Sequence, residues 1–263
     1  MGMAIWRIDA FTDRPFAGNP AGVMILDQPA DPAWMQDVAL EMNLSETAFL
    51  WPEEDGFRLR WFTPTVEVEL CGHATVASAH LLFESGRLRP DDRATFYTLS
   101  GPLYAVREAD GGLSVDFPAE PESPADPPSI LAESLGVTPR YVGKNRFDYL
   151  VEVESEAFVR SLRPDFNLMA ALPVRGVIAT ARSASPEYDF VSRFFAPAAG
   201  VNEDPVTGSA HCCLGPFWKK RLKKNELVGY QASRRGGTVR VRVGEGRVTI
   251  GGRAVTVIRG EFL

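Results

Sequence analysis

One short pattern occurs twice in the chain, about half the chain's length apart. The first copy is Arg60-Trp61-Phe62-Thr63-Pro64, followed by Cys71-Gly72-His73-Ala74. The second copy is Arg193-Phe194-Phe195-Ala196-Pro197, followed by Thr207-Gly208-Ser209-Ala210. Each copy is typical of an aromatic strand, a turn marked by proline and the glycine-led start of a helix. The repetition predicts two similar half-domains that face each other.

Each glycine-led helix start predicts a place where an anion can bind. The first N–H groups of a helix have no partner within the helix, and they carry the positive end of its dipole. Polar side chains gather at the same two places in the sequence. We therefore expect both helix starts to serve one cleft and the function to lie there.

Composition indicates an ordinary globular protein and argues against a nucleic-acid partner. The 263 residues suffice for one large domain or two of about 130. The net charge is −6, and the single basic run, 219–224, is expected to be the solvated C-terminal end of a helix. No stretch approaches the ~20 apolar residues that cross a bilayer, so no membrane partner is expected.

Cysteine usage predicts a reducing compartment. The three cysteines are an odd number, two of them are adjacent, and no disulfide framework follows from Cys71, Cys212 and Cys213. The first nine residues lack the layout of a signal peptide. We therefore expect a cytoplasmic protein.

Hydrophobic patterning predicts the same order of elements in each half. The run from Gly72 to Phe83 is almost without charge, which is typical of a buried central helix. Asp31-Pro32 is a typical helix start. The Pro-rich segment 119–129 predicts a linker, after which strands, amphipathic helices and a second buried helix near Gly208 follow. The predicted lobes are 1–118, which the last strand at about 253–263 could complete, and 119–252.

Two carboxylates are candidates for chemistry. Glu46 enters an apolar strand, where burial can raise a carboxyl pKa toward that of a general base, although a surface glutamate at a strand end fits as well. Asp204 precedes a proline, which fits an ordinary turn, but it also lies beside the second helix start. Ser209 and the backbone at Gly208 fit either an anion site or helix capping.

A histidine and a cysteine flank the first helix-start glycine. His73 is mirrored by Ser209 across the repeat, and Cys71 occupies a position where a helix N-terminus can lower a thiol pKa. A structural histidine and an inert thiol are the alternatives. No metal-ligand spacing, Walker A loop, dinucleotide fingerprint or nucleophile elbow is present, so no metal or cofactor is expected.

Several segments together resemble the phenazine-biosynthesis isomerase-like (PhzF-like) family, which shares its fold with diaminopimelate epimerases. They span nearly the whole chain in the expected order. The matching segments are Asp9-Ala10-Phe11-Thr12, Phe16-Ala17-Gly18-Asn19-Pro20-Ala21, Leu44-Ser45-Glu46-Thr47-Ala48-Phe49, the two copies of the repeat, and Glu203-Asp204-Pro205-Val206-Thr207-Gly208-Ser209-Ala210.

The resemblance implies an α/β protein of two pseudo-symmetric lobes, each a mixed β-barrel-like sheet around a central helix. It implies a homodimeric, cofactor-free isomerase that moves a proton on a small, carboxylated substrate. The family's catalytic glutamate falls on Glu46, and its supporting residues fall on His73, Asp204 and Ser209. The residues expected to bind substrate are Asn19, Ser45, Gly72, Gly208 and Ser209.

The chain departs from the epimerase relatives at one position. Those enzymes use two cysteines, one before each glycine, whereas this chain has Cys71 at the first position and Thr207 at the second. A single carboxylate that moves a proton along one face of a substrate fits what remains. The alternatives are an amino-acid epimerase or racemase that uses Cys71 with a second base, and a non-catalytic binding protein that retains the fold.

Overall fold

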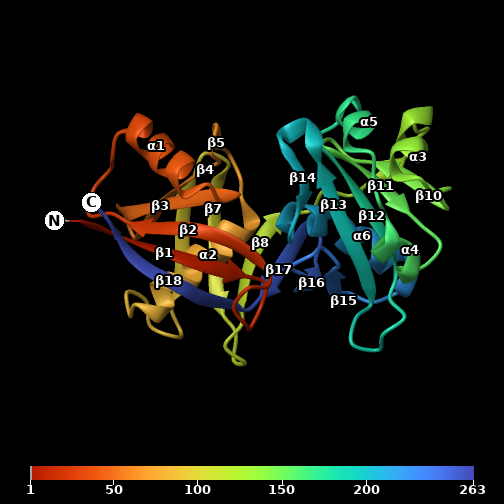
Figure 1. The fold of residues 1–263 in the computed structure, drawn as a ribbon. Coiled ribbons are helices and arrows are strands. Elements are labelled where there is room, and N and C mark those ends of the chain that lie inside the picture. The colour runs from red at the N-terminus through yellow and green to blue at the C-terminus, as the bar shows by residue number, and fades with distance from the viewer. Residues whose placement is uncertain (1) are drawn as a thin grey trace. The chain divides into compact units, whose positions relative to one another are not determined.

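The computed structural model describes residues 2–263 and divides into two compact units. We call the unit made of residues up to Phe117 and of Thr249–Leu263 the first lobe. We call Pro118–Val248 the second lobe. Figure 1 labels their elements along the chain.

The first lobe is a mixed sheet with two helices. Its strands follow the order β18-β1-β2-β3-β4-β6-β7-β8, and the short β5 pairs with β4. The pairs β2–β3 and β4–β6 are parallel, and the others are antiparallel. The elements are β1 (Met3–Ala10), β2 (Asn19–Ile25), α1 (Pro32–Met42), β3 (Glu46–Glu53), β4 (Gly56–Phe62), β5 (Glu67–Val68), α2 (Gly72–Glu84), β6 (Arg93–Thr98), β7 (Gly101–Arg107), β8 (Leu113–Pro118) and β18 (Ala254–Phe262).

The second lobe repeats this plan. Its strands follow the order β9-β10-β11-β12-β13-β15-β16, and the short β14 pairs with β13. The pairs β11–β12 and β13–β15 are parallel. The elements are β9 (Ser123–Pro124), α3 (Ser129–Leu135), β10 (Tyr141–Lys144), β11 (Asp148–Glu152), α4 (Glu156–Ser161), α5 (Phe166–Ala170), β12 (Gly176–Arg182), β13 (Phe190–Ala196), a 3-10 turn (Pro197–Ala199), β14 (Val201–Asp204), α6 (Gly208–Leu222), β15 (Glu226–Gln231) and β16 (Gly237–Val243). The last strand before β18, β17 (Arg247–Gly252), begins in the second lobe and ends in the first.

The two lobes therefore correspond strand by strand, including the sense of each pairing. Strands β1, β2, β3 and β4 of the first lobe match β10, β11, β12 and β13 of the second, and helix α2 matches α6. The registers agree as well, because Thr47 lies opposite Phe62 on β3–β4 and Val177 lies opposite Phe195 on β12–β13. The repeat in the sequence is a repeat of structure.

The arginine of each repeat makes an equivalent contact with a glutamate in its own lobe. Arg60 makes two hydrogen bonds to Glu67, of 2.6 and 2.7 Å, and so ties β4 to β5. Arg193 makes two to Glu203, of 2.7 and 2.9 Å, and so ties β13 to β14. Bidentate arginine–carboxylate pairs fix geometry as well as charge. Each pair therefore anchors the segment that leads into the central helix.

Both central helices are buried, as their low charge predicts. Ten of the 13 residues of α2 are buried, and the helix packs against β1, β2, β3, β7 and β18. Ten of the 15 residues of α6 are buried, and the helix packs against β15 and β16. The basic run contributes Lys219, Lys220 and Arg221 to the last turn of α6, where cations suit the helix dipole.

The outer helices close the hydrophobic cores. In the first lobe, Met35 and Val38 of α1 pack with Phe49 and Phe62. Asp31 caps α1 by accepting a hydrogen bond of 2.9 Å from the Ala33 N–H, which confirms the predicted helix start. In the second lobe, α3, α4 and α5 contribute Leu131, Val159 and Met169. Among residues 2–263, no helix has both the length and the apolar character needed to span a membrane.

Several short elements were not predicted from the sequence. Strand β9 lies within the segment that we expected to be a linker without structure, where it pairs with β10. Strand β15 follows directly after the basic run, where no strand was predicted. Both are held by pairing with strands that are distant in the chain, and this pairing outweighs the weak local signals of proline and lysine.

Candidate active site

In the first lobe, Glu46 and His73 meet at the start of β3 and the start of α2. Glu46 is the first residue of β3, and the antiparallel register places the next residue, Thr47, opposite the end of β4. The chain then passes through β5 into α2, whose second residue is His73. This connection brings Nε2 of His73 to 3.2 Å from Oε2 of Glu46. The side chains are 6% and 19% exposed, respectively.

His73 is a neutral imidazole at neutral pH. Burial lowers the pKa of His73 to about 3, because the charged ring loses the solvation that water would give it. The contact with Glu46 is therefore not an ion pair. A neutral imidazole donates a hydrogen bond from one ring nitrogen and accepts one at the other.

Cys71 lies on the other side of the same ring. Its sulfur is 3.5 Å from Nδ1 of His73. The thiol, the imidazole and the carboxylate each place one ligand atom within 4.8 Å of the others, and these residue types also bind zinc. However, the thiol faces one ring nitrogen and the carboxylate faces the other, so a metal ion on either nitrogen would require one of them to move around the ring.

The remaining first-lobe candidates lie at the same end of the sheet. Asn19 begins β2 and is fully buried, and Ala21, two residues later, lies opposite Glu46 in the parallel register. Ser45 directly precedes Glu46. Gly72 is the first residue of α2, and no side chain caps this helix start. The structure thus brings all of the predicted first-lobe residues to one place.

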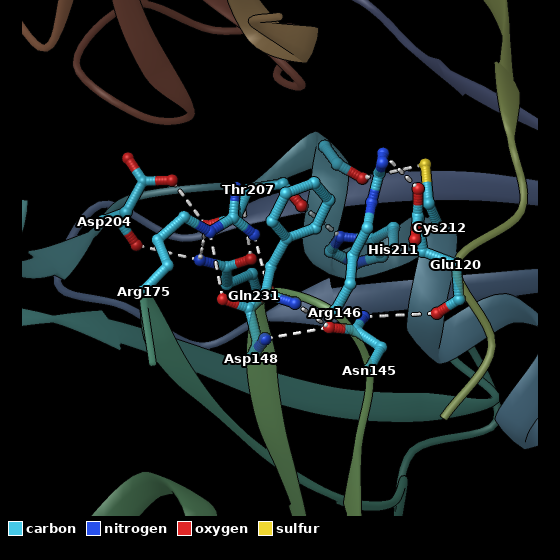
Figure 2. A network of polar contacts seen from close by, with 12 residues as sticks. Glu120, Asn145, Arg146, Asp148, Arg175, Asp204, Thr207, His211, Cys212 and Gln231 are labelled. Carbon is cyan, nitrogen blue, oxygen red and sulfur yellow. Dashed lines mark hydrogen bonds and ion pairs between the residues drawn. The ribbon is translucent and has the colours of Figure 1, made fainter. Parts of the chain in front are cut away.

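In the second lobe, Asp204 belongs to a chain of hydrogen bonds that sequence reasoning missed (Figure 2). The Thr207 hydroxyl donates to Oδ2 of Asp204. The amide of Gln231 donates to the Thr207 hydroxyl at 3.1 Å and to the Asp204 carbonyl at 2.8 Å. Its oxygen accepts from the Thr207 N–H at 2.9 Å.

This chain of donors fixes the direction of the Asp204 contact. Since an amide N–H can only donate, the Thr207 hydroxyl oxygen accepts from Gln231. The single hydroxyl proton of Thr207 is therefore donated to Asp204. Gln231 is fully buried and sits at the end of β15, so it holds Asp204 and the start of α6 together. A glutamine at the end of an unpredicted strand gave no signal in the sequence.

The start of α6 resembles the start of α2. Gly208 is the first helical residue, Ser209 follows it, and no side chain caps the helix, because the Thr207 hydroxyl bonds to Asp204. One turn later, Nδ1 of His211 lies 2.8 Å from the Thr207 carbonyl. Since a carbonyl can only accept, the ring carries its proton on Nδ1.

The pairing registers also show what the second lobe lacks. In the β2–β3 pair of the first lobe, Glu46 lies opposite Ala21. In the matching β11–β12 pair of the second lobe, the equivalent position is Gly176, which lies opposite Asp148. A Cβ atom at Gly176 would lie 2.5 Å from Cζ of Phe194, so no side chain fits there without a shift of the ring. Thr207 stands where the first lobe has Cys71. Neither the Glu46 carboxylate nor the Cys71 thiol therefore has a counterpart at the matching position of the second lobe.

The buried histidines predict a loss of stability in mild acid. Burial lowers the pKa of His211 to about 4 and that of His73 to about 3, against 6.5 for an ordinary histidine. The unfolded chain therefore takes up protons near pH 6.5, whereas the folded chain resists them. Stability is complete above pH 6.5 and falls as the pH drops toward 4, on the order of 3 kcal/mol for each group.

Urea unfolding at pH 7.5 and pH 5.0 measures this loss. His211→Asn keeps a side-chain donor for the Thr207 carbonyl but removes the titrating ring. We expect the variant to lose less free energy of unfolding between the two pH values than the wild type does. An equal loss in both proteins would show that folding does not lower the pKa of His211.

Comparison with known proteins places the chain in a family. The model of the phenazine biosynthesis-like protein family, PhzC-PhzF, matches residues 8–260. An uncharacterized isomerase of Halalkalibacterium halodurans is 53% identical over 264 residues, which cover 100% of this chain and 99% of that one. The crystal structure of a PhzF-family phenazine biosynthesis protein from Enterococcus faecalis is 40% identical, with a TM-score of 0.95 over 100% of both chains.

A more distant neighbour shows how widely the fold is shared. A probable proline racemase from Agrobacterium radiobacter K84 is 13% identical and has a TM-score of 0.69, covering 99% of this chain and 93% of that one. The predicted epimerase-like α/β fold is confirmed. The family model and the relatives named as isomerases support isomerase activity for this chain. The chain belongs to the phenazine biosynthesis-like protein family.

Proposed function

We propose that the protein is a one-base isomerase that moves a proton along one face of a small carboxylated substrate. The observation that carries this proposal is the pairing of Glu46 with a neutral His73 at 3.2 Å, together with the absence of an equivalent base at Gly176. A racemase needs proton donors and acceptors on opposite faces of one carbon. A single carboxylate can instead take a proton from one carbon and return it to another.

The neighbouring groups have defined roles in this proposal. Glu46 removes the proton from an activated C–H. His73 lies beside the carboxylate and carries no charge, so it makes no ion pair with Glu46 and leaves it free to act as a base. In the second lobe, Asp204 is oriented by Thr207, and the uncapped N–H groups at Gly208 and Ser209 are suited to binding anionic oxygens.

The test is a screen for solvent deuterium exchange. Cyclic and linear amino and hydroxy acids are incubated in deuterated water with the wild type and with Glu46→Gln. We expect at least one carboxylated compound to gain deuterium with the wild type only. Exchange at the same rate with both proteins would remove Glu46 from the mechanism.

An epimerase that uses Cys71 is the second candidate. The observation in its favour is the 3.5 Å contact of the thiol with Nδ1 of His73, which gives the sulfur a nearby base. It differs from the first proposal in its prediction for Cys71→Ala. The epimerase would lose exchange with this variant, whereas the one-base isomerase would keep most of it.

We also expect the activity to be independent of metal ions. The thiol of Cys71 and the carboxylate of Glu46 face different nitrogens of the His73 ring, which disfavours the coordination of one ion by all three. Treatment with EDTA, followed by removal of the chelator, should leave the exchange rate unchanged. A loss on treatment that zinc or another divalent ion restores would contradict this expectation.

A further inference from the structure

A partly exposed arginine lies in the second lobe, directly before the position that matches Glu46. Arg175 precedes Gly176, just as Ser45 precedes Glu46 in the first lobe. The Arg175 N–H donates to the Phe147 carbonyl at 2.8 Å, which ties the segment before β12 to the segment before β11. Arg175 thus stands at the end of the sheet where α6 also begins.

The guanidinium of Arg175 is held rigidly. Its Nε and Nη2 donate to the two carboxylate oxygens of Asp148 at 2.9 and 2.5 Å (Figure 2). Its Cζ lies 5.0 Å from the centre of the Phe147 ring and 5.4 Å from that of Phe194. An arginine fixed by a bidentate partner and by aromatic faces loses little entropy when it binds a further group.

Asp148 and Arg175 differ sharply in exposure. The Asp148 side chain is 1% exposed and that of Arg175 is 37% exposed. Asp148 uses one edge of the guanidinium, made of Nε and one N–H of Nη2. The other edge, made of Nη1 and the second N–H of Nη2, makes no hydrogen bond among residues 2–263. Such an edge matches a carboxylate by two parallel bonds.

Gly176 and Phe194 build the platform for this arginine. Because Gly176 has no side chain, the ring of Phe194 can lie where a Cβ would be 2.5 Å from Cζ. Phe194 also lies opposite Asp204 in the β13–β14 register, so the same residue contacts Arg175 and places Asp204. Where the first lobe has Glu46, the second lobe thus has Gly176. This glycine makes room for Phe194, whose ring packs against the guanidinium of Arg175.

We propose that Arg175 is a specificity-determining residue that binds a carboxylate of the substrate through its outer edge. The statement that this carboxylate belongs to the substrate rests on the proposed function. The site itself does not, because it consists of Arg175, Asp148, Phe147 and Phe194 within one lobe. A ligand that offers a carboxylate to this edge would be preferred over its amide.

The test uses malonate as the probe and uncharged malonamide as its control, with Arg175 Nε–Hε followed by nitrogen-15 NMR. In the wild type, malonate should shift this signal saturably and malonamide should not. Arg175→Gln alone would leave Asp148 buried without its partner, so the main variant is the pair Asp148→Asn with Arg175→Gln. Binding, followed through the backbone amide of Phe147, should weaken at least 10-fold in this pair.

Two matched variants complete the design. Arg182→Gln removes an exposed arginine at the other end of β12 and should bind malonate as the wild type does. Glu46→Gln should also bind normally, so a failure of the isomerase proposal would not be mistaken for a failure of this one. Equal binding by the Asp148/Arg175 pair and the wild type would overturn the inference. Equal shifts at many arginines, an adventitious ion only, would overturn it as well.

Discussion

Glu46→Gln is expected to reduce turnover by ~10²–10⁴, the usual contribution of general acid–base catalysis. Glutamine keeps the shape of the side chain and can still bond to His73, but it cannot take up a proton. Substrate binding should therefore change little. The measurement is steady-state kinetics with whichever carboxylated compound the exchange screen identifies, with kcat and KM determined separately.

Cys71→Ala is the matched control for this prediction. Both side chains contact the ring of His73, from opposite nitrogens, so both variants disturb the same imidazole. If Glu46 is the base, the alanine variant should keep most of its turnover. A large loss in Cys71→Ala with near-normal turnover in Glu46→Gln would instead assign the chemistry to the thiol.

Gly176→Ala is expected to lower the free energy of unfolding by about 1–3 kcal/mol, the usual cost of overpacking a core. The new Cβ would lie 2.5 Å from Cζ of Phe194 and 2.8 Å from the carbonyl oxygen of Phe195, and the latter belongs to the backbone and cannot rotate away. Urea denaturation measures the effect through the transition midpoint.

Gly260→Ala provides the control, since a Cβ at that position would meet no atom within 4 Å. It should leave the midpoint nearly unchanged. If the two variants unfold at the same urea concentration, the second lobe has room for a side chain at Gly176. The structural argument against a second base at that position would then fail.

The sequence predicted the repeat and the central helices because their signals are local. The aromatic strands, the prolines and the uncharged run from Gly72 each favour one structure within a short window. His73, Asp204 and Ser209 became candidates because they lie at or near the repeated helix starts, and Glu46 because it enters an apolar strand and matches the catalytic glutamate of the family that the chain resembles. The structure places Glu46 against His73 and Asp204 beside the start of α6.

The remaining features depend on contacts between distant parts of the chain. Gln231 reaches Thr207 across 24 residues, and Arg175 reaches Asp148 across 27. Nothing near Gln231 or Arg175 in the sequence distinguishes them from surface residues. The match of Gly176 with Glu46 likewise becomes visible only from the strand registers.

Transfer of an isotope from substrate to product tests the one-base account most directly. A substrate deuterated at the reacting C–H is turned over once by the wild type in ordinary water, and the product is analysed for the position of the label. The account predicts that deuterium appears at a second carbon, because Glu46 carries the same proton between the two positions. A product inverted at the original carbon, with its new hydrogen taken wholly from solvent, would contradict it.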